Sequence, residues 1–165
     1  MVKLKTGAGT GNLGKIPKAG VVVFFLVAAF IASIDQITKK AASSLIPQGG
    51  IPIVEGLFHL TLVRNTGAGF GLFQNNNGVL LAISLIVVVS ILFFLKSILK
   101  NGFLTMGTSF IFGGAIGNII DRITLGHVID FLDFRIWPVF NAADAAITIG
   151  AILVGISLWK KEEQR

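Results

Sequence analysis

Three carboxylates lie unusually close to a stretch that is apolar enough to cross a membrane. The segment HVIDFLDFRIWPVFNAADAAITIG, residues 127–150, places Asp130 and Asp133 just before this stretch and Asp144 inside it. An ionised side chain at bilayer depth costs about 2.5 to 3.5 kcal/mol on insertion scales, so such residues tend to serve a function. The chemistry open to them depends on where they face and on which other reactive groups are available.

Two nearby carboxylates can catalyse hydrolysis without any other reactive group. The chain has no cysteine, and His59 and His127 are its only histidines. Thiolate catalysis is therefore excluded, and no motif supports a Ser-His-Asp arrangement or a metal site. Adjacent aspartates cannot both ionise easily, so one can deprotonate water while the other, still protonated, polarises a scissile carbonyl. Peptide hydrolysis fits this chemistry and needs neither a metal nor a cofactor.

The composition is that of a membrane protein. Hydrophobic residues make up 53% of the 165 residues and charged residues only 13%, against about 25% in soluble domains. Four apolar stretches, residues 19–34, 79–95, 103–120 and 140–159, approach the length of about 20 residues that a transmembrane helix needs. We expect an all-α membrane protein with four transmembrane helices in one domain, residues 19–165, after a flexible basic cytoplasmic tail, residues 1–18.

The basic residues predict the orientation of these spans. Nine of the fourteen fall on one side: Lys3, Lys5, Lys15, Lys18, Lys96, Lys100, Lys160, Lys161 and Arg165. By the positive-inside rule this side is the cytoplasm, so both termini are expected there. We expect these residues to set topology and contact membrane lipids rather than to bind nucleic acid.

The segment between the first two spans is long enough to carry structure of its own outside the membrane. Within it, FHLTLVR, residues 58–64, alternates with the period of a β-strand, which predicts a small extracytoplasmic β element. NTGAGFG, residues 65–71, follows directly, and its glycines would let the backbone approach a ligand closely. A glycine-rich turn between strands is the alternative interpretation.

Carboxylates from three predicted helices converge on the outer face. Asp35 ends the first span, Asp121 ends the third, and Asp144 lies about one turn into the fourth. The lysines and apolar residues before Asp35 also resemble a cleavable signal peptide, but we expect a retained helix because Asp35 belongs to the cluster. Spacing does not choose between Asp121 and Asp130 as the partner of Asp144, whereas Asp133 is expected to be a solvated loop carboxylate.

Helical spacing also places polar side chains on shared faces. Gly114, Asn118 and Arg122 recur at i, i+4 and i+8. Asn141, Asp144 and Thr148 fall on one face of the fourth span. These faces could line a site, or they could serve bundle packing through small residues and interhelical hydrogen bonds.

Five motifs in order carry a resemblance to a known family: DQITK (35–39), NTGAGFG (65–71), GGAIGNIIDR (113–122), GHVIDF (126–131) and FNAADAAITIG (140–150). Over residues 20–159 the chain resembles bacterial lipoprotein signal peptidase, or signal peptidase II. The resemblance implies a four-helix aspartyl protease of the bacterial cytoplasmic (inner) membrane, with its active site near the outer face. Its partners would be membrane lipids and diacylglyceryl-modified prolipoproteins, which it would cut before the lipidated cysteine of the substrate.

The resemblance also implies a role for individual residues. The catalytic pair would be Asp130 and Asp144, and Asp35 and Asp121 would give structural support. The residues expected to contact substrate are Asn65, Gly114, Asn118, Arg122 and Asn141. The alternative function is a small membrane transporter or ion-binding protein that uses the same acidic cluster, but neither inverted repeats nor mid-span breaks are visible.

Overall fold

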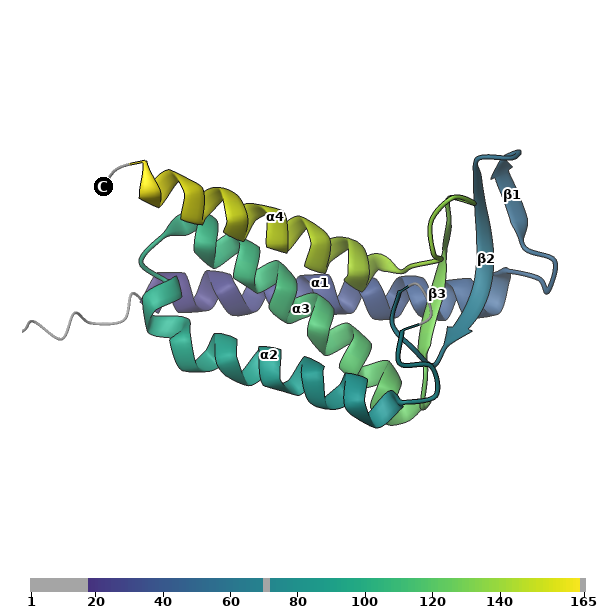
Figure 1. Ribbon diagram of the computed structural model, residues 1–165, viewed down its shortest axis with the longest axis horizontal. Coiled ribbons are helices and arrows are strands. Elements are labelled where there is room, and N and C mark those ends of the chain that lie inside the picture. Colours follow the sequence, from purple (N-terminus) through teal and green to yellow (C-terminus); the bar gives the residue numbers. More distant parts are fainter. Residues whose placement is uncertain (1–17, 70–71, 164–165) are drawn as a thin grey trace, which may run out of the picture.

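Four long helices lie side by side and carry a small β-sheet at one end (Figure 1). This computed structural model describes residues 18–69 and 72–163, so nearly all of the predicted tail lies outside the described residues. The helices are α1 (Lys18–Leu45), α2 (Asn77–Ile98), α3 (Gly102–Thr124) and α4 (Ala142–Glu162). Each is long and apolar enough to cross a membrane, which confirms the four predicted spans.

Helix α3 is the central helix of the bundle and packs against the other three. Within an apolar stretch of 18 residues, 50% of the residues of α3 are buried, compared with 11% of those of α2. Close packing in a membrane depends on small residues, because lipid tails are as apolar as the side chains they compete with. Gly107 of α3 meets Gly150 of α4, and a Cβ added to Gly150 would lie 2.5 Å from the Gly107 carbonyl oxygen. This close contact brings the polar residues near the other end of α3 next to the start of α4.

The sheet has three antiparallel strands in the order β1-β2-β3: β1 (Ile51–Val54), β2 (Phe58–Asn65) and β3 (Val128–Asp133). Strand β2 confirms the strand predicted at residues 58–64. In the β2–β3 register, Val63 pairs with Asp130 and Asn65 pairs with Val128. The sheet thus joins the segment after α1 to the segment after α3, and it brings Asn65 close to Asp130.

The helices that contain the first and third spans continue beyond the predicted ends of these spans. Helix α1 continues ten residues beyond Asp35 to Leu45, and α3 continues past Asp121 to Thr124. Hydropathy places a span end at the first charged residues, but here Asp35, Lys39 and Asp121 face inward and find partners, so the helices need not stop. The added turns of α1 also support the sheet, because Ala42 of α1 and Ile46, the residue after α1, pack against Phe131 of β3.

Candidate active site

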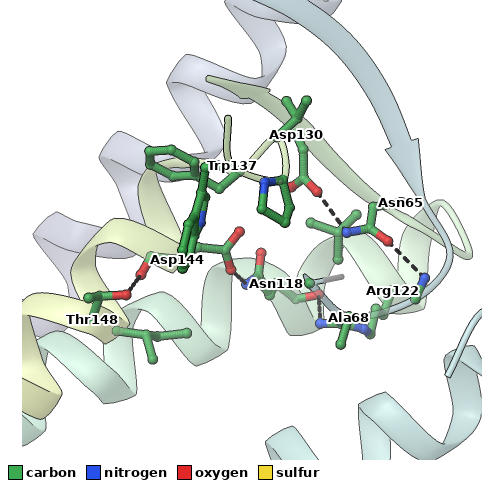
Figure 2. Close-up of a pocket in the computed structure, with 15 residues that line it drawn as sticks. Asn65, Ala68, Asn118, Arg122, Asp130, Trp137, Asp144 and Thr148 are labelled. Carbon is green, nitrogen blue, oxygen red and sulfur yellow. Dashed lines mark hydrogen bonds between the residues drawn. The ribbon is translucent and has the colours of Figure 1, made fainter. Parts of the chain in front are cut away.

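A cavity of about 290 Å³ lies where the sheet meets the helices, and Asp130 and Asp144 both line it (Figure 2). Asp130 comes from β3 and Asp144 from the first turn of α4. The other polar side chains of its lining are Asn65, Asn118, Arg122 and Thr148. The fold therefore brings carboxylates from separate segments, one on a strand and one on a helix, to the same cavity.

Asp130 is held by two asparagines and is almost fully buried. The side-chain amide of Asn65 donates to its Oδ2 at 2.8 Å, and that of Asn141 donates to its Oδ1 at 2.7 Å. Burial and, secondly, the negative charge of Asp144 raise the pKa of Asp130 to about 7. The two hydrogen bonds and the charge of Lys39 oppose this shift without cancelling it.

Asp144 is part of the cap of α4. Its backbone N–H donates to Oδ1 of Asn141 at 2.9 Å, and the Asn141 N–H donates to Oδ2 of Asp144 at 3.3 Å, which together form a capping box. The side-chain amide of Asn118 donates to Oδ1 of Asp144 at 2.8 Å. The cap of α4 and the amide of Asn118 thus fix the position of the Asp144 side chain.

Two of the residues expected to contact substrate, Asn141 and Gly114, do not line the cavity. Asn141 is 0% exposed, and both its amide and its backbone are used to hold the two aspartates. Gly114 is buried against α4, where an added Cβ would lie 2.6 Å from the Ala143 carbonyl oxygen. Substrate contact by these two residues stays a prediction, and their surroundings indicate positioning and close helix packing.

Asn65, Asn118 and Arg122 do reach the cavity, as the resemblance implies for substrate-contacting residues. Among the described residues, the Arg122 guanidinium makes a long hydrogen bond, 3.5 Å, to the carbonyl oxygen of Asn118, and it faces the carboxyl groups of Asp144, Asp130 and Asp121. It keeps donors that can bind an acceptor on a ligand, because a guanidinium carries five N–H groups.

The glycine-rich segment also lines the cavity, through Gly67, Ala68 and Gly69. The backbone N–H of Gly67 donates to Oδ1 of Asn65 at 2.8 Å, which turns the amide nitrogen of Asn65 toward Asp130. A Cβ on Gly67 would lie 2.8 Å from the carbonyl oxygen of Leu72, so only glycine fits there without a shift. Residues 70–71 of the motif lie outside the described part of the chain. The position of the loop favours ligand contact over a plain turn.

Asp35 and Asp121 meet at Lys39 instead of at the cavity. The ammonium nitrogen of Lys39 lies 2.8 Å from Oδ2 of Asp35 and 2.9 Å from Oδ2 of Asp121, and all three side chains are buried. Asp121 is thus the partner of a lysine, while Asp130 shares the cavity with Asp144. Lys39 was expected in the outer segment, although its i, i+4 spacing from Asp35 in DQITK is the sequence signal for such a pair.

Asp133 was expected to be a solvated loop carboxylate, and this expectation was wrong. It ends β3, and its side chain is only 8% exposed. It accepts hydrogen bonds from Thr61 at 2.9 Å and from the Arg135 side chain at 3.0 Å. Burial acts to raise the pKa of Asp133, but these bonds and that from the Arg135 backbone outweigh it and hold the pKa below its usual value.

An apolar cavity of about 540 Å³ adjoins the acidic one. The two share Trp137, Phe140, Asp144 and Thr148 in their linings. The second cavity is completed by Phe134, Ile136, Ala145 and Ile149. A ligand that reaches Asp144 can therefore place polar groups on one side of this carboxylate and apolar groups on the other.

The fold and the cavity define a helical membrane protein that brings two carboxyl groups, those of Asp130 and Asp144, to one cavity. Residues 27–160 match the family described as Signal peptidase (SPase) II. The chain is 39% identical over 140 residues to a lipoprotein signal peptidase of Halothermothrix orenii, covering 84% of this chain and 97% of that one. It is 44% identical over 139 residues to a lipoprotein signal peptidase of Brevibacillus brevis, covering 82% and 91%.

A solved structure shares the fold as well as the sequence. It is a bacterial membrane enzyme determined by the in meso method at 2.3 Å resolution, with a TM-score of 0.81 and 31% identity, covering 88% of this chain and 92% of that one. The chain belongs to the signal peptidase II family. Membership of a peptidase family identifies a protease, so the transporter alternative has no support.

Proposed function

We propose that this protein is an aspartyl endopeptidase that removes signal peptides from diacylglyceryl-modified prolipoproteins and cuts before the lipidated cysteine. The observation that carries the proposal is the meeting of Asp130 and Asp144 at one cavity, each held by asparagine donors. The relatives named lipoprotein signal peptidase support the substrate class. The paired acids support the catalytic type, because peptide hydrolysis by two carboxylates needs no other reactive group.

The surroundings of the two aspartates assign their roles. Asp130 holds a proton near neutral pH because burial and the charge of Asp144 raise its pKa to about 7. Asp144 lies in the first turn of α4, where its side chain accepts a hydrogen bond from the amide of Asn118 at 2.8 Å, and it is assigned the role of general base. Asp144 takes a proton from water as the water oxygen attacks the scissile carbonyl carbon, and Asp130 gives its proton to the carbonyl oxygen. Asp144 then passes its proton to the leaving amine as the C–N bond breaks, and Asp130 regains a proton as the carbonyl re-forms.

The paired cavities support a lipid-bearing peptide as substrate. In the acidic cavity Arg122 and Asn65 can bind peptide or ester carbonyl oxygens beside the reacting bond. The apolar cavity, which shares Asp144 with it, is large enough for a branched hydrocarbon group or apolar side chains. A substrate that carries both kinds of group next to its scissile bond fits this arrangement better than a plain soluble peptide.

The charge distribution supports a topology for the enzyme. The start of α1, the end of α2, the start of α3 and the end of α4 lie at the end of the bundle away from the sheet (Figure 1). Four lysines belong to these helix ends or to the connection between α2 and α3: Lys18, Lys96, Lys100 and Lys160. By the positive-inside rule this end faces the cytoplasm, which puts both termini there and the two aspartates near the outer face of the bacterial cytoplasmic membrane. At that depth the active site can meet the junction between a membrane-embedded signal peptide and an exported protein.

The proposal is tested by incubating the purified protein with a diacylated prolipoprotein and with the same prolipoprotein lacking the lipid. We expect a gel shift for the lipidated form only, and mass spectrometry should show that the signal peptide ends immediately before the modified cysteine. Absence of cleavage, or equal cleavage of the unlipidated form, would contradict the proposal. A cut at another bond would contradict the assigned cleavage site alone.

A further inference from the structure

Lys39 is a buried ammonium whose acceptors come from two helices. Its Nζ lies 2.8 Å from Oδ2 of Asp35, 2.9 Å from Oδ2 of Asp121 and 2.9 Å from Oδ1 of Asn118. Only 2% of the residue is exposed. An ammonium has three protons, so each can be directed at one of these oxygens. The chemistry assigned to Asp130 and Asp144 does not require Lys39 to touch a substrate.

The two carboxylates bound to Lys39 each hold the backbone just before one aspartate of the cavity. Oδ1 of Asp35 accepts from the backbone N–H of Ala143 at 2.9 Å, and Ala143 precedes Asp144. Oδ2 of Asp121 accepts from the backbone N–H of Ile129 at 3.1 Å, and Ile129 precedes Asp130. Lys39 therefore ties together the two carboxylates that fix the start of α4 and the start of β3.

The third contact of Lys39 sets the orientation of an amide. Lysine has no acceptor, so the Asn118 oxygen must face the ammonium, and the Asn141 amide donates to the same oxygen at 3.2 Å. The Asn118 nitrogen is thereby left to donate to Oδ1 of Asp144 at 2.8 Å. Reversal of this amide would replace a hydrogen bond to Asp144 with an oxygen–oxygen repulsion.

We propose that Lys39 is a positioning residue for catalysis, which sets the spacing of Asp130 and Asp144 and the amide that faces Asp144. The inference rests on the proposed function, because it assumes that these two aspartates react. Stability alone does not account for the cluster, since replacing a buried ion pair with apolar side chains is often neutral or stabilising. A displacement of about 1 Å at a reacting group can cost about a hundredfold in rate. The position of the start of α4 relative to the start of β3 therefore matters for turnover.

The charge of Lys39 has a separate consequence for the pH profile. The charged groups that face Asp130 are Asp144 on α4, Arg122 on α3 and Lys39 on α1. The positive charge of Lys39 lowers the pKa of Asp130, so its removal raises that pKa further. Activity requires the Asp130 proton, and the alkaline limb of the profile should therefore move to higher pH when Lys39 is neutral.

The test compares three variants in the full-length protein. Lys39→Met removes the ammonium, and Lys39→Met with Asp121→Asn removes it while leaving the cluster with its native net charge. Lys40→Met is the matched control, because Lys40 is the next residue of α1 and is exposed. For each variant, kcat, KM and the pH profile are measured on a diacylated prolipoprotein, and thermal unfolding reports on the fold.

We expect kcat to fall by about a hundredfold in both Lys39 variants while KM stays within about threefold, and we expect no change in Lys40→Met. The alkaline limb of the pH profile should move to higher pH by more in Lys39→Met than in Lys39→Met with Asp121→Asn. A folded Lys39 variant with native kcat and a native alkaline limb would overturn the inference. Failure of both Lys39 variants to fold would also overturn it, in favour of a purely structural role.

The Asp144→Asn variant, measured alongside, separates this inference from the proposed function. Cleavage that survives in Asp144→Asn would refute the aspartyl mechanism, whatever the Lys39 variants do. Loss of cleavage in Asp144→Asn together with native kinetics in Lys39→Met would refute the positioning role alone.

Discussion

The side-chain amide of Asn141 donates a hydrogen bond to Oδ1 of Asp130 at 2.7 Å. The backbone N–H of the same residue donates to Asp144, and its side-chain oxygen caps α4. One fully buried asparagine thus holds the acid on β3 and the acid on α4 at the same time. The residue that caps α4 is therefore also the residue that holds Asp130 and Asp144 in position.

Replacement of Asn141 should separate its capping role from its bridging role. Asn141→Ala removes both, and loss of an N-cap costs about 1 kcal/mol of stability. Asn141→Ser keeps a good capping residue, but its side chain is too short to hold Asp130. We expect both variants to lose about a hundredfold in kcat and only Asn141→Ala to unfold at clearly lower temperature. Native kcat in Asn141→Ser would show that the bridge to Asp130 is dispensable.

The pH dependence of cleavage should report the proton on Asp130. Its pKa is raised to about 7, chiefly by burial and then by the charge of Asp144. The active form keeps this proton, so kcat/KM should fall by about tenfold per pH unit above that pKa. Asn65→Ala removes a hydrogen bond that lowers this pKa, so its alkaline limb should lie at higher pH. A profile that stays flat between about pH 6 and 9 would contradict the proton assignment.

The contact between α3 and α4 can be tested at two glycines of α4. A Cβ at Gly150 would lie 2.5 Å from the Gly107 carbonyl oxygen, whereas a Cβ at Gly155 would meet no atom within 4 Å. Overpacking costs about 1 to 3 kcal/mol, so Gly150→Ala should lower the unfolding temperature in detergent and reduce cleavage. Gly155→Ala is the matched control and should be neutral or slightly stabilising, because alanine is the better helix former. Equal stability of the two variants would mean that the helices do not approach this closely.

Arg122 should contribute to substrate recognition through its guanidinium. A hydrogen bond from a charged donor contributes about 1.5 to 3 kcal/mol, so Arg122→Gln should reduce kcat/KM by about 10- to 100-fold. Arg64→Gln is the control, since Arg64 precedes Asn65 on β2, is exposed and does not line the cavity. Native kcat/KM in Arg122→Gln would place the substrate away from α3.

Hydropathy and charge bias predict the four spans and the convergence of acids from three helices at one end of the bundle. These features follow from local periodicity and from the cost of charge in lipid. Strand β2 is also predictable, because FHLTLVR alternates. Strand β3 is not, since VIDFLD lacks a clean alternation and becomes a strand through pairing with β2, far away in the sequence.

Spacing alone does not choose between Asp121 and Asp130; the resemblance implies Asp130, and in the structure Asp130 lines the same cavity as Asp144. Both lie near the start of α4 in sequence terms, and only the position of Lys39 shows that Asp121 has a different partner. Hydropathy ends the first span at Asp35, so it treats Lys39 as an exposed loop residue. The burial of a lysine depends on acceptors contributed by another helix, and no local pattern contains that information.

The most direct test of the catalytic pair is cleavage of a diacylated prolipoprotein by purified Asp130→Asn and Asp144→Asn variants. Asparagine keeps the size of the side chain and removes its acid–base function. Asp133→Asn is the control, because Asp133 lies three residues from Asp130 on the same strand but does not line the cavity. We predict that Asp130→Asn and Asp144→Asn insert and fold normally but lose about 10²- to 10⁴-fold in kcat, while Asp133→Asn cleaves at close to the native rate. Native turnover in either Asp130→Asn or Asp144→Asn would contradict the account.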